Sequence, residues 1–484
     1  MNQQFEQELL SSWQERQEYA EMMQPLLGKL YRDKAVEISL YGKPLLGATA
    51  IDIIKAHRTV RLHEGEKLRL RESWPILEEL SRLKLAPAQI DLGRLAYGYH
   101  YGGKGEGLDI PAYLKQELAD IVDQEDNQAP RDVVLYGFGR IGRLMARLLI
   151  ERQGRNNKLR LKAIVVRGGK DGDLEKRASL LRRDSVHGPF NGSITVDHER
   201  NALKANGAYI QVIYANSPDE VDYTKYGIKD AIVVDNTGIW RDRDGLGLHL
   251  KAKGTSKVIL TAPGKGDIKN IVHGVNDADI LPEDTILSAA SCTTNAITPA
   301  LKALDEMYGI KNGHVETVHS YTNDQNLIDN YHKADRRGRS APLNMVMTET
   351  GAAKAVAKAY PKLQGKLTGN AIRVPTPNVS LAILNLNLDK STSKDEINAF
   401  LRDTSLHSTL HNQVDYTEST EIVSSDLVGS RAACVVDSQA TIVSDDRATL
   451  YLWYDNEFGY SCQVMRCVQT MAGQQFGVYP KVAN

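Results

Sequence analysis

The chain has 484 residues, of which 42% are hydrophobic and 25% charged, and its formal net charge at pH 7 is −1. This length predicts two or three domains, and the balanced charge gives no sign of nucleic-acid or anionic-membrane binding. The first residues lack the pattern of a secretory signal, and no run of 18 apolar residues could span a membrane. The four cysteines have neither disulfide-framework nor zinc-site spacing, so we expect a cytoplasmic protein with no metal site.

Residues 1–128 are predicted to form a mostly helical N-terminal extension. Apolar residues recur at helical spacing from Leu9 to Leu30, and further helical patterns cover Ile51–Val60, Trp74–Leu83 and Ile110–Val122. Within the extension, the segment KAHRTVRLH (55–63) is basic. We interpret it as a solvated helix end, with binding of an anion or a partner as the alternative. For the extension as a whole we consider three roles: regulation, capping of the assembly and binding of a protein partner.

From Val133 onwards the pattern changes to short apolar runs rich in β-branched residues, separated by helical stretches. This alternation predicts a doubly wound parallel sheet with helices on both faces, the Rossmann type of α/β fold. We assign residues 129–290 to this domain and expect residues 455–484 to complete it. Residues 291–454, with the β-rich run NVSLAILNLNL (378–388), are predicted to form an α+β catalytic domain with a mainly antiparallel sheet.

A glycine-rich turn stands between the first strand of this sheet and the following helix. Gly137, Gly139 and Gly142 form the pattern G-x-G-x-x-G in YGFGRIGRL. Glycines in this context let the backbone approach a pyrophosphate, and the helix N-terminus offers it free N–H groups. The turn therefore predicts a dinucleotide site, and a tight turn without a ligand is the alternative.

The end of the second strand carries Arg167, where dinucleotide sites that take NAD have an acidic residue for the ribose hydroxyls. A guanidinium cannot accept a hydrogen bond, but it can pair with the 2′-phosphate of NADP. We therefore favour NADP over NAD, with an arginine that points into solvent as the alternative.

Cys292 lies in SCTTNAITP (291–299), between hydroxyl side chains. A lone cysteine is most often a small buried hydrophobe, so the motif alone does not establish a nucleophile. A helix beginning at or just after Cys292 would lower the pKa of its thiol and favour that role.

Eight motifs together carry a resemblance to a known family. They are YGFGRIGRL, RDSVHGPFNG, DNTG, SCTTNAITP, ETVHSYTNDQ, TGAAKAV, RVPTPNVS and WYDNEFGYS. Their order resembles that of phosphorylating glyceraldehyde-3-phosphate dehydrogenases from about Arg131 to the C-terminus. The resemblance implies the reversible reaction of D-glyceraldehyde 3-phosphate, phosphate and NAD(P)+ to 1,3-bisphosphoglycerate, as in glycolysis and gluconeogenesis. It also implies a homotetramer.

The resemblance implies a role for each matching residue. Cys292 would be the nucleophile and His319 its proton-transfer partner, in a mechanism that passes through a thioester. By the same resemblance, the residues that contact inorganic phosphate or the substrate's phosphate are Ser291, Thr293, Thr322, Arg339, Thr350, Gly351 and Arg373. The cofactor contacts are Gly137, Gly139, Arg140, Ile141, Gly142, Arg167, Thr237, Thr261, Asn456 and Tyr460.

The loop TNDQNLIDNYHKADRRGRSAPL after His319 departs from the family pattern and resembles the related erythrose-4-phosphate dehydrogenases. Because Thr350 and Gly351 still match the inorganic-phosphate contacts, we favour glyceraldehyde 3-phosphate. Erythrose 4-phosphate, a non-phosphorylating reaction and a non-catalytic cofactor-binding regulator remain as alternatives.

Overall fold

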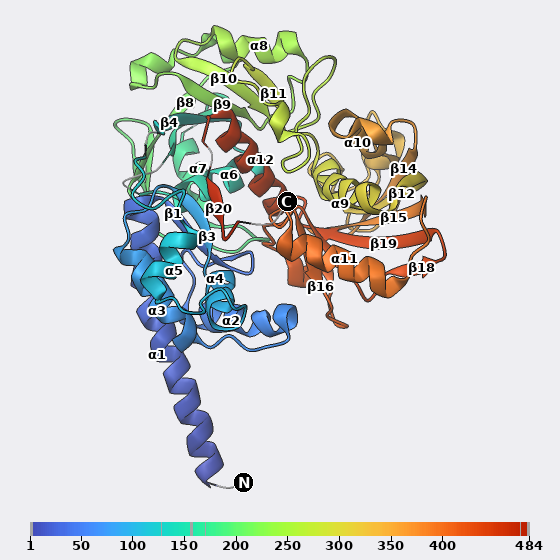
Figure 1. The fold of residues 1–484 in the computed structure, drawn as a ribbon. Helices are drawn as coiled ribbons and strands as arrows, with labels where there is room; N and C mark the ends of the chain where they lie inside the picture. The colour runs from blue at the N-terminus through green and yellow to red at the C-terminus, as the bar shows by residue number, and fades with distance from the viewer. Residues whose placement is uncertain (1–2, 127, 155–157, 170, 475, 482–484) are drawn as a thin grey trace.

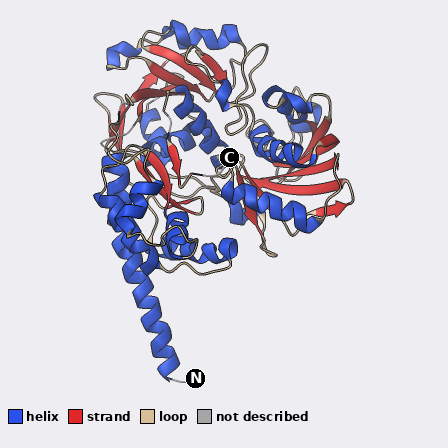
Figure 2. Cartoon of the chain, viewed as in Figure 1, coloured by secondary structure: helices blue, strands red, loops and turns tan. Residues whose placement is uncertain are grey.

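The structure is a computed structural model that describes residues 3–126, 128–154, 158–169, 171–474 and 476–481. The described residues form three sheets, each with its own helices and its own apolar core (Figure 1, Figure 2). A mixed α/β fold with a parallel sheet and a separate, mainly antiparallel sheet is thereby confirmed. No described helix is both long enough and apolar enough to cross a membrane.

The N-terminal region contains the predicted helices and also a sheet that the sequence did not predict. The helices are α1 (Gln3–Lys34), α2 (Ala50–Glu64), α3 (Leu70–Arg82), α4 (Leu92–His100) and α5 (Ile110–Glu117). The strands are β1 (Val36–Leu40), β2 (Lys43–Pro44) and β3 (Ala88–Asp91), joined by β20 (Gly477–Tyr479) in the order β2-β1-β3-β20. Strand β20 lies parallel to β3. Three of these strands have only two to four residues, too few for an alternating pattern to reveal them.

Helix α1 is only half covered by the rest of the protein. Its buried residues are Ala20, Met23, Leu27 and Leu30, all in its second half. The first half projects from the body of the molecule (Figure 1), and its apolar side chains Phe5, Leu9 and Leu10 are exposed.

The second sheet is the predicted Rossmann sheet, with strand order β11-β10-β9-β4-β5-β8-β7-β6. Six strands run parallel: β4 (Arg131–Tyr136), β5 (Leu159–Val166), β8 (Ala208–Tyr214), β9 (Ala231–Asp235), β10 (Thr255–Leu260) and β11 (Ile286–Ser288). The edge strands β6 (Ile194–Asp197) and β7 (Ala202–Ala205) are antiparallel. The helices are α6 (Arg140–Glu151), α7 (Asp173–Arg182), α8 (Arg243–Lys251) and α12 (Phe458–Met471).

Residues of helix α12 pack in the same apolar core as the Rossmann sheet. The chain then leaves the domain, because β20 joins the N-terminal sheet and not the Rossmann sheet. One C-terminal segment therefore connects the two regions.

The third sheet lies within residues 310–454 and has the order β13-β14-β12-β15-β19-β17-β16, with β18 on β19. Its strands are β12 (Ile310–Ser320), β13 (Val346–Glu349), β14 (Leu367–Val374), β15 (Ser380–Leu388), β16 (Val414–Thr417), β17 (Cys434–Asp437), β18 (Ile442–Ser444) and β19 (Arg447–Tyr454). Its helices are α9 (Cys292–Tyr308), α10 (Ala352–Ala359) and α11 (Lys394–His407). Only β12–β14 and β16–β17 pair in parallel.

Candidate active site

Cys292 is the first residue of α9, at the point where the chain leaves the Rossmann sheet after β11. Ser291 caps the helix: its hydroxyl accepts a hydrogen bond from the Thr294 backbone N–H at 3.0 Å. The side chain of Cys292 is partly buried and lies between the cores of the two domains. The structure therefore places Cys292 at the start of a helix, as predicted.

His319 lies beside Cys292, although 26 residues separate them in the sequence. Near the end of β12, its Nε2 is 3.5 Å from the Cys292 Sγ, and its Nδ1 is 2.7 Å from the Ser320 carbonyl oxygen. The Arg373 Nη1, which only donates, also lies 3.1 Å from Nδ1, but it can donate to the Ser320 carbonyl oxygen instead. Because a carbonyl oxygen only accepts and is the closer neighbour, we assign the proton of the neutral ring to Nδ1. The lone pair of Nε2 then faces the thiol and is placed to take its proton.

Arg373 stands next to His319 because β14 pairs in parallel with β12, with these two residues in register. Its guanidinium donates to the Ser320 carbonyl oxygen at 3.1 Å and lies 3.5 Å from the Thr322 hydroxyl. Its buried Nε has no hydrogen-bond partner in the described part of the protein. A buried cation with a free donor suits an anionic group of a substrate.

Burial shifts both members of the Cys292–His319 pair toward their neutral forms. Burial raises the pKa of the Cys292 thiol, against the opposing effects of the Arg373 charge and of hydrogen bonds involving Thr293. Burial, with the Arg373 charge second, lowers the pKa of His319 to about 3. The helix start was expected to lower the thiol pKa; burial outweighs it, so the free site holds a thiol and a neutral imidazole.

The hydroxyl groups of the predicted phosphate-binding residues are partly engaged in hydrogen bonds within the protein. The Thr293 hydroxyl is buried and lies 2.9 Å from the Tyr454 hydroxyl, so its side chain is already engaged. Thr350 and Gly351 lie at the start of α10, where the Thr350 hydroxyl accepts from the Ala352 N–H at 3.2 Å.

Arg339 is 65% exposed and pairs with Asp329 at 2.9 Å. Arg337, two residues earlier and not singled out from the sequence, is the arginine of this loop nearer the catalytic pair. Its charge contributes to the lowered pKa values of both His319 and Arg373.

The glycine turn fits a bound dinucleotide. A Cβ atom on Gly142 would lie 2.3 Å from the Gly137 carbonyl oxygen, so the helix can pack against the turn only without a side chain. A Cβ atom on Gly139 would meet nothing within 4 Å, which leaves open space in front of α6. Gly139 caps α6 without a side-chain hydrogen bond, so the first N–H groups of the helix face that space.

The other predicted cofactor residues surround the same edge of the sheet. Thr237 and Thr261 follow β9 and β10, and their hydroxyls bond Asp235 at 2.7 and 3.1 Å. Ile141 packs against the domain core. The Arg140 guanidinium is held by Glu457, at 3.0 Å, and by Asp184, so its backbone and not its side chain is available to a ligand.

Asn456 and Tyr460 lie at the start of α12. The Asn456 side-chain oxygen accepts from the Ser380 hydroxyl at 2.8 Å, and the Tyr460 hydroxyl donates to the Ala290 carbonyl oxygen at 2.9 Å. The Asn456 amide is thus fixed to β15, and the Tyr460 ring links α12 to the residues just before Cys292. Arg167 directly follows β5 and is exposed.

Two groups in the site were not found from the sequence. The Tyr454 hydroxyl joins Thr293 and Thr317, at 2.9 and 2.8 Å, and thus ties α9 to β12 behind the catalytic pair. His187 lies 3.1 Å from the Asp455 carboxylate. Both belong to motifs quoted above, WYDNEFGYS and RDSVHGPFNG, and the motifs were the available signal.

Comparison with known proteins identifies the family. Residues 131–243 match the model for the NAD binding domain of glyceraldehyde 3-phosphate dehydrogenase, and residues 291–456 match the model for its C-terminal domain. A glyceraldehyde-3-phosphate dehydrogenase-like protein of Pseudomonas aeruginosa is 59% identical over 463 residues, 95% of this chain and 100% of the relative. That match necessarily includes most of residues 1–128.

Other relatives match a smaller part of the chain. A chloroplastic glyceraldehyde-3-phosphate dehydrogenase of Arabidopsis thaliana is 42% identical over 71% of this chain and 84% of its own length. The glyceraldehyde-3-phosphate dehydrogenase of Zymomonas mobilis is 39% identical over 70% of this chain and 98% of its own length. With two matching family models and relatives that align over nearly their whole length, this chain belongs to the glyceraldehyde-3-phosphate dehydrogenase family.

Proposed function

We propose that this protein oxidises D-glyceraldehyde 3-phosphate to 1,3-bisphosphoglycerate, with inorganic phosphate as the second substrate and NAD+ or NADP+ as the hydride acceptor. The observation that supports it most directly is the Cys292 Sγ–His319 Nε2 distance of 3.5 Å, with Arg373 beside the pair. These are the groups that thioester chemistry on a phosphorylated aldehyde requires.

In the first step the Cys292 sulfur attacks the aldehyde carbon. The S–H proton passes to His319 Nε2, a sulfur–carbon bond forms, and the carbonyl π electrons move to oxygen. Protonation of that oxygen by His319 gives a hemithioacetal. Arg373 and Thr322 are placed to hold the substrate's phosphate, since the guanidinium has a free donor.

In the second step His319 takes the hydroxyl proton of the hemithioacetal, and the carbon–oxygen double bond reforms as hydride leaves the carbon. The nicotinamide, when bound, supplies the hydride acceptor, and Asn456 is the residue that would orient it. The product on Cys292 is a thioester. A phosphate oxygen then attacks its carbonyl carbon, and the Cys292 sulfur leaves as thiolate and is reprotonated by His319.

Ser291, Thr350 and Gly351 are our candidates for holding inorganic phosphate during that attack. The Ser291 hydroxyl lies directly before Cys292, and Thr350 and Gly351 lie at the start of α10, where backbone N–H groups are free to donate. Thr293 would contribute through its backbone, because Tyr454 engages its hydroxyl.

We also propose that NADP is preferred, because Arg167 is exposed at the end of β5, where a 2′-phosphate would lie. The test is the catalytic efficiency with each cofactor in the wild type and in Arg167→Asp. The variant should favour NAD. Lys229→Asp, the same change of charge on an exposed residue before β9, is the control and should keep the wild-type preference. A wild type that prefers NAD contradicts the proposal.

The reaction itself is tested by initial rates with glyceraldehyde 3-phosphate, with and without phosphate, in the wild type and in Cys292→Ser. The proposal requires a rate that depends on both phosphate and Cys292. A phosphate-independent rate would indicate release of the free acid. Activity with erythrose 4-phosphate but not with glyceraldehyde 3-phosphate would identify the longer sugar as the substrate. Activity with neither aldehyde would favour a non-catalytic role.

The wider assembly and the cell compartment are also proposals. We infer a homotetramer from the family to which the chain belongs, and a cytoplasmic location from its four cysteines, which form no disulfide. Light scattering of the purified chain tests the first, and cell fractionation tests the second.

A further inference from the structure

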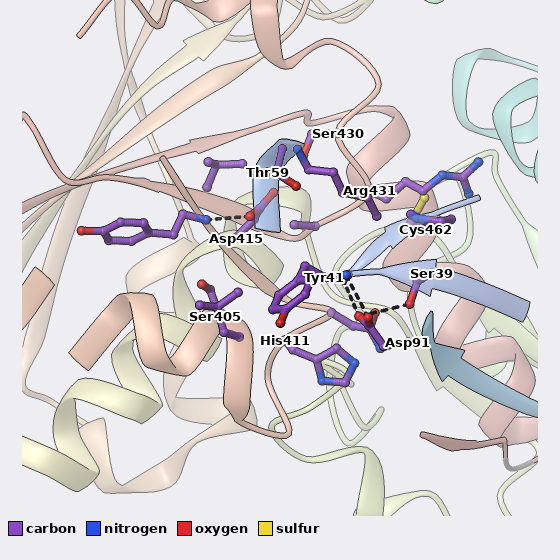
Figure 3. Close-up of a pocket in the computed structure, with 18 of the residues that line it drawn as sticks. Ser39, Tyr41, Thr59, Asp91, Ser405, His411, Asp415, Ser430, Arg431 and Cys462 are labelled. Carbon is purple, nitrogen blue, oxygen red and sulfur yellow. Dashed lines mark hydrogen bonds between the residues drawn. The ribbon is translucent and has the colours of Figure 1, made fainter. Parts of the chain in front are cut away.

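A large cavity lies where the N-terminal region meets the rest of the protein (Figure 3). Its volume is about 770 Å³, within the range of pockets that bind metabolites. One wall comes from β1, α2, β3 and α4 of the N-terminal region. The opposite wall comes from α11, β16 and α12, and Cys292, His319 and Arg373 do not line it. The cavity is therefore separate from the candidate active site.

The lining of the cavity carries more positive than negative charge. Six arginines and lysines line it against four aspartates and glutamates. Three of the arginines come from different elements: Arg94 from α4, Arg152 from the end of α6 and Arg466 from α12. Separate parts of the chain thus bring guanidinium groups to one space.

These three arginines keep hydrogen-bonding capacity that the protein does not use. Within the described residues, Arg94 Nε, Arg152 Nη1 and Arg466 Nη1 are buried and have no hydrogen-bond partner. The Arg94 side chain is only 8% exposed. Buried donors without partners are rare in folded proteins, because each loses its bonds to water.

Two carboxylates on the lining approach these arginines, but only at long distance. Asp91 accepts hydrogen bonds from the backbone N–H groups of Tyr41, Gly42 and Arg94, at 2.9 to 3.0 Å, and lies 3.9 Å from the Arg94 guanidinium. Glu37 lies 3.5 Å from Arg152. Burial lowers the pKa of the Arg466 side chain, and the charges of Arg152 and Arg431 act in the same direction, against the opposing effects of Cys462 and Glu37.

We propose that this cavity binds a small metabolite that carries phosphate or carboxylate groups, at a site distinct from the catalytic one. Oxyanions accept several hydrogen bonds at once and pair with the forked donors of arginine. Hydroxyl and amide side chains on the lining, including Thr59, Ser405, Asn412 and Ser430, suit the polar remainder of such a molecule. Thr59 and His63 come from the basic segment 55–63, for which anion binding was the alternative reading.

Helix α12 gives the site a direct connection with the cofactor side of the protein. Asn456 lies two residues before this helix and Tyr460 in its first turn, and the helix lines the cavity with Cys462, Met465, Arg466 and Gln469. Arg431, also on the cavity wall, lies over the Phe458 ring in the first turn of α12, at 5.2 Å. A bound ligand would therefore contact the helix that begins two residues after Asn456, the proposed nicotinamide-binding residue.

The experiment is isothermal titration of the full chain with pyrophosphate, citrate and ATP, each at up to millimolar concentration. Four proteins are compared: wild type, Arg373→Ala in the active site, and Arg466→Met and Gln469→Glu in the cavity. We expect at least one probe to bind wild type and Arg373→Ala alike, with an affinity lower by about tenfold or more in Arg466→Met.

Gln469→Glu keeps the proposal testable if Arg466→Met does not fold. Gln469 lies three residues after Arg466, on the same face of α12, so a carboxylate there would occupy the arginine's free donors. This variant should bind the probe more weakly and unfold at a higher temperature than wild type.

Three outcomes overturn the proposal. In the first, none of the three probes binds. In the second, Arg373→Ala abolishes binding and Gln469→Glu leaves it unchanged. In the third, neither cavity variant weakens binding. None of these depends on turnover, so a failure here is distinct from a failure of the proposed reaction.

Discussion

Replacing His319 by asparagine should remove the proton acceptor of the reaction while leaving the fold in place. His319 is buried, and burial with the Arg373 charge lowers its pKa to about 3 from 6.5. At 1.36 kcal/mol per pH unit, the imidazolium is disfavoured by about 5 kcal/mol. Attraction to a thiolate at 3.5 Å recovers about 5 kcal/mol at an effective dielectric constant of 20.

The cost of protonating His319 and the gain from its attraction to the thiolate are therefore similar, but burial also raises the pKa of the thiol. The neutral pair is therefore the resting form, and the proton moves as the sulfur attacks. A positioned general base contributes roughly 10²- to 10⁴-fold to a rate, so His319→Asn should lower kcat by that factor. Alkylation of Cys292 by iodoacetamide at neutral pH should also slow, since it needs the same deprotonation.

The assay is steady-state NAD(P)H formation together with the alkylation rate, measured for wild type, His319→Asn and His314→Asn. His314 lies on the same strand but bonds Thr368 and Asn370 away from the thiol, so its variant should behave as wild type. A His319→Asn protein that keeps more than about a tenth of the wild-type kcat would refute the role of general base.

Three further changes test other parts of the structure. Arg373→Gln should raise KM for the phosphorylated aldehyde by about tenfold or more, because a charge-assisted pair with phosphate is lost; an unchanged KM would place the phosphate elsewhere. Gly142→Ala puts a Cβ atom 2.3 Å from the Gly137 carbonyl oxygen, so the KM for the cofactor, measured from initial rates, should rise. An unchanged KM for the cofactor would contradict the need for a tight turn. His57 is buried with a pKa lowered to about 4, so the folded state binds fewer protons than the unfolded state between about pH 6.5 and pH 4. As pH falls through that window, His57 alone should lower the free energy of unfolding by about 3 kcal/mol. In urea titrations the fall should therefore be smaller in His57→Leu than in wild type by about that amount, and equal falls in both proteins would contradict the pKa shift.

The parts of the fold that could be predicted are those with a local pattern. The strands of the Rossmann sheet are continuous apolar runs because helices cover both faces, and the glycine turn identifies the first of them. The N-terminal sheet was missed for the opposite reason. Strands β2, β3 and β20 are short, and β20 comes from the far end of the sequence, so no local window contains the pairing.

In the candidate site, too, some features could be predicted from sequence motifs and others depend on the folded structure. Motifs were sufficient to select Cys292, His319 and Arg373, which the structure brings together. Motifs did not distinguish Arg339 from Arg337, because only the folded loop decides which arginine turns toward the pair. The rise in the thiol pKa was also beyond the sequence, since burial depends on how two domains close around the side chain.

The pairing of β20 with β3 bears on how the chain acquires its structure during synthesis. Strand β3 leaves the ribosome early, but its neighbour Gly477–Tyr479 is made only after both other domains have emerged. The N-terminal sheet therefore has an open edge throughout elongation, and an unpaired edge invites association with other chains. Chaperone dependence should accordingly be greater for a chain that stops before β20 than for the full chain. A tag fused directly after Tyr479 would sit at this late-closing edge, far from the catalytic pair in sequence but on the segment that completes the first domain.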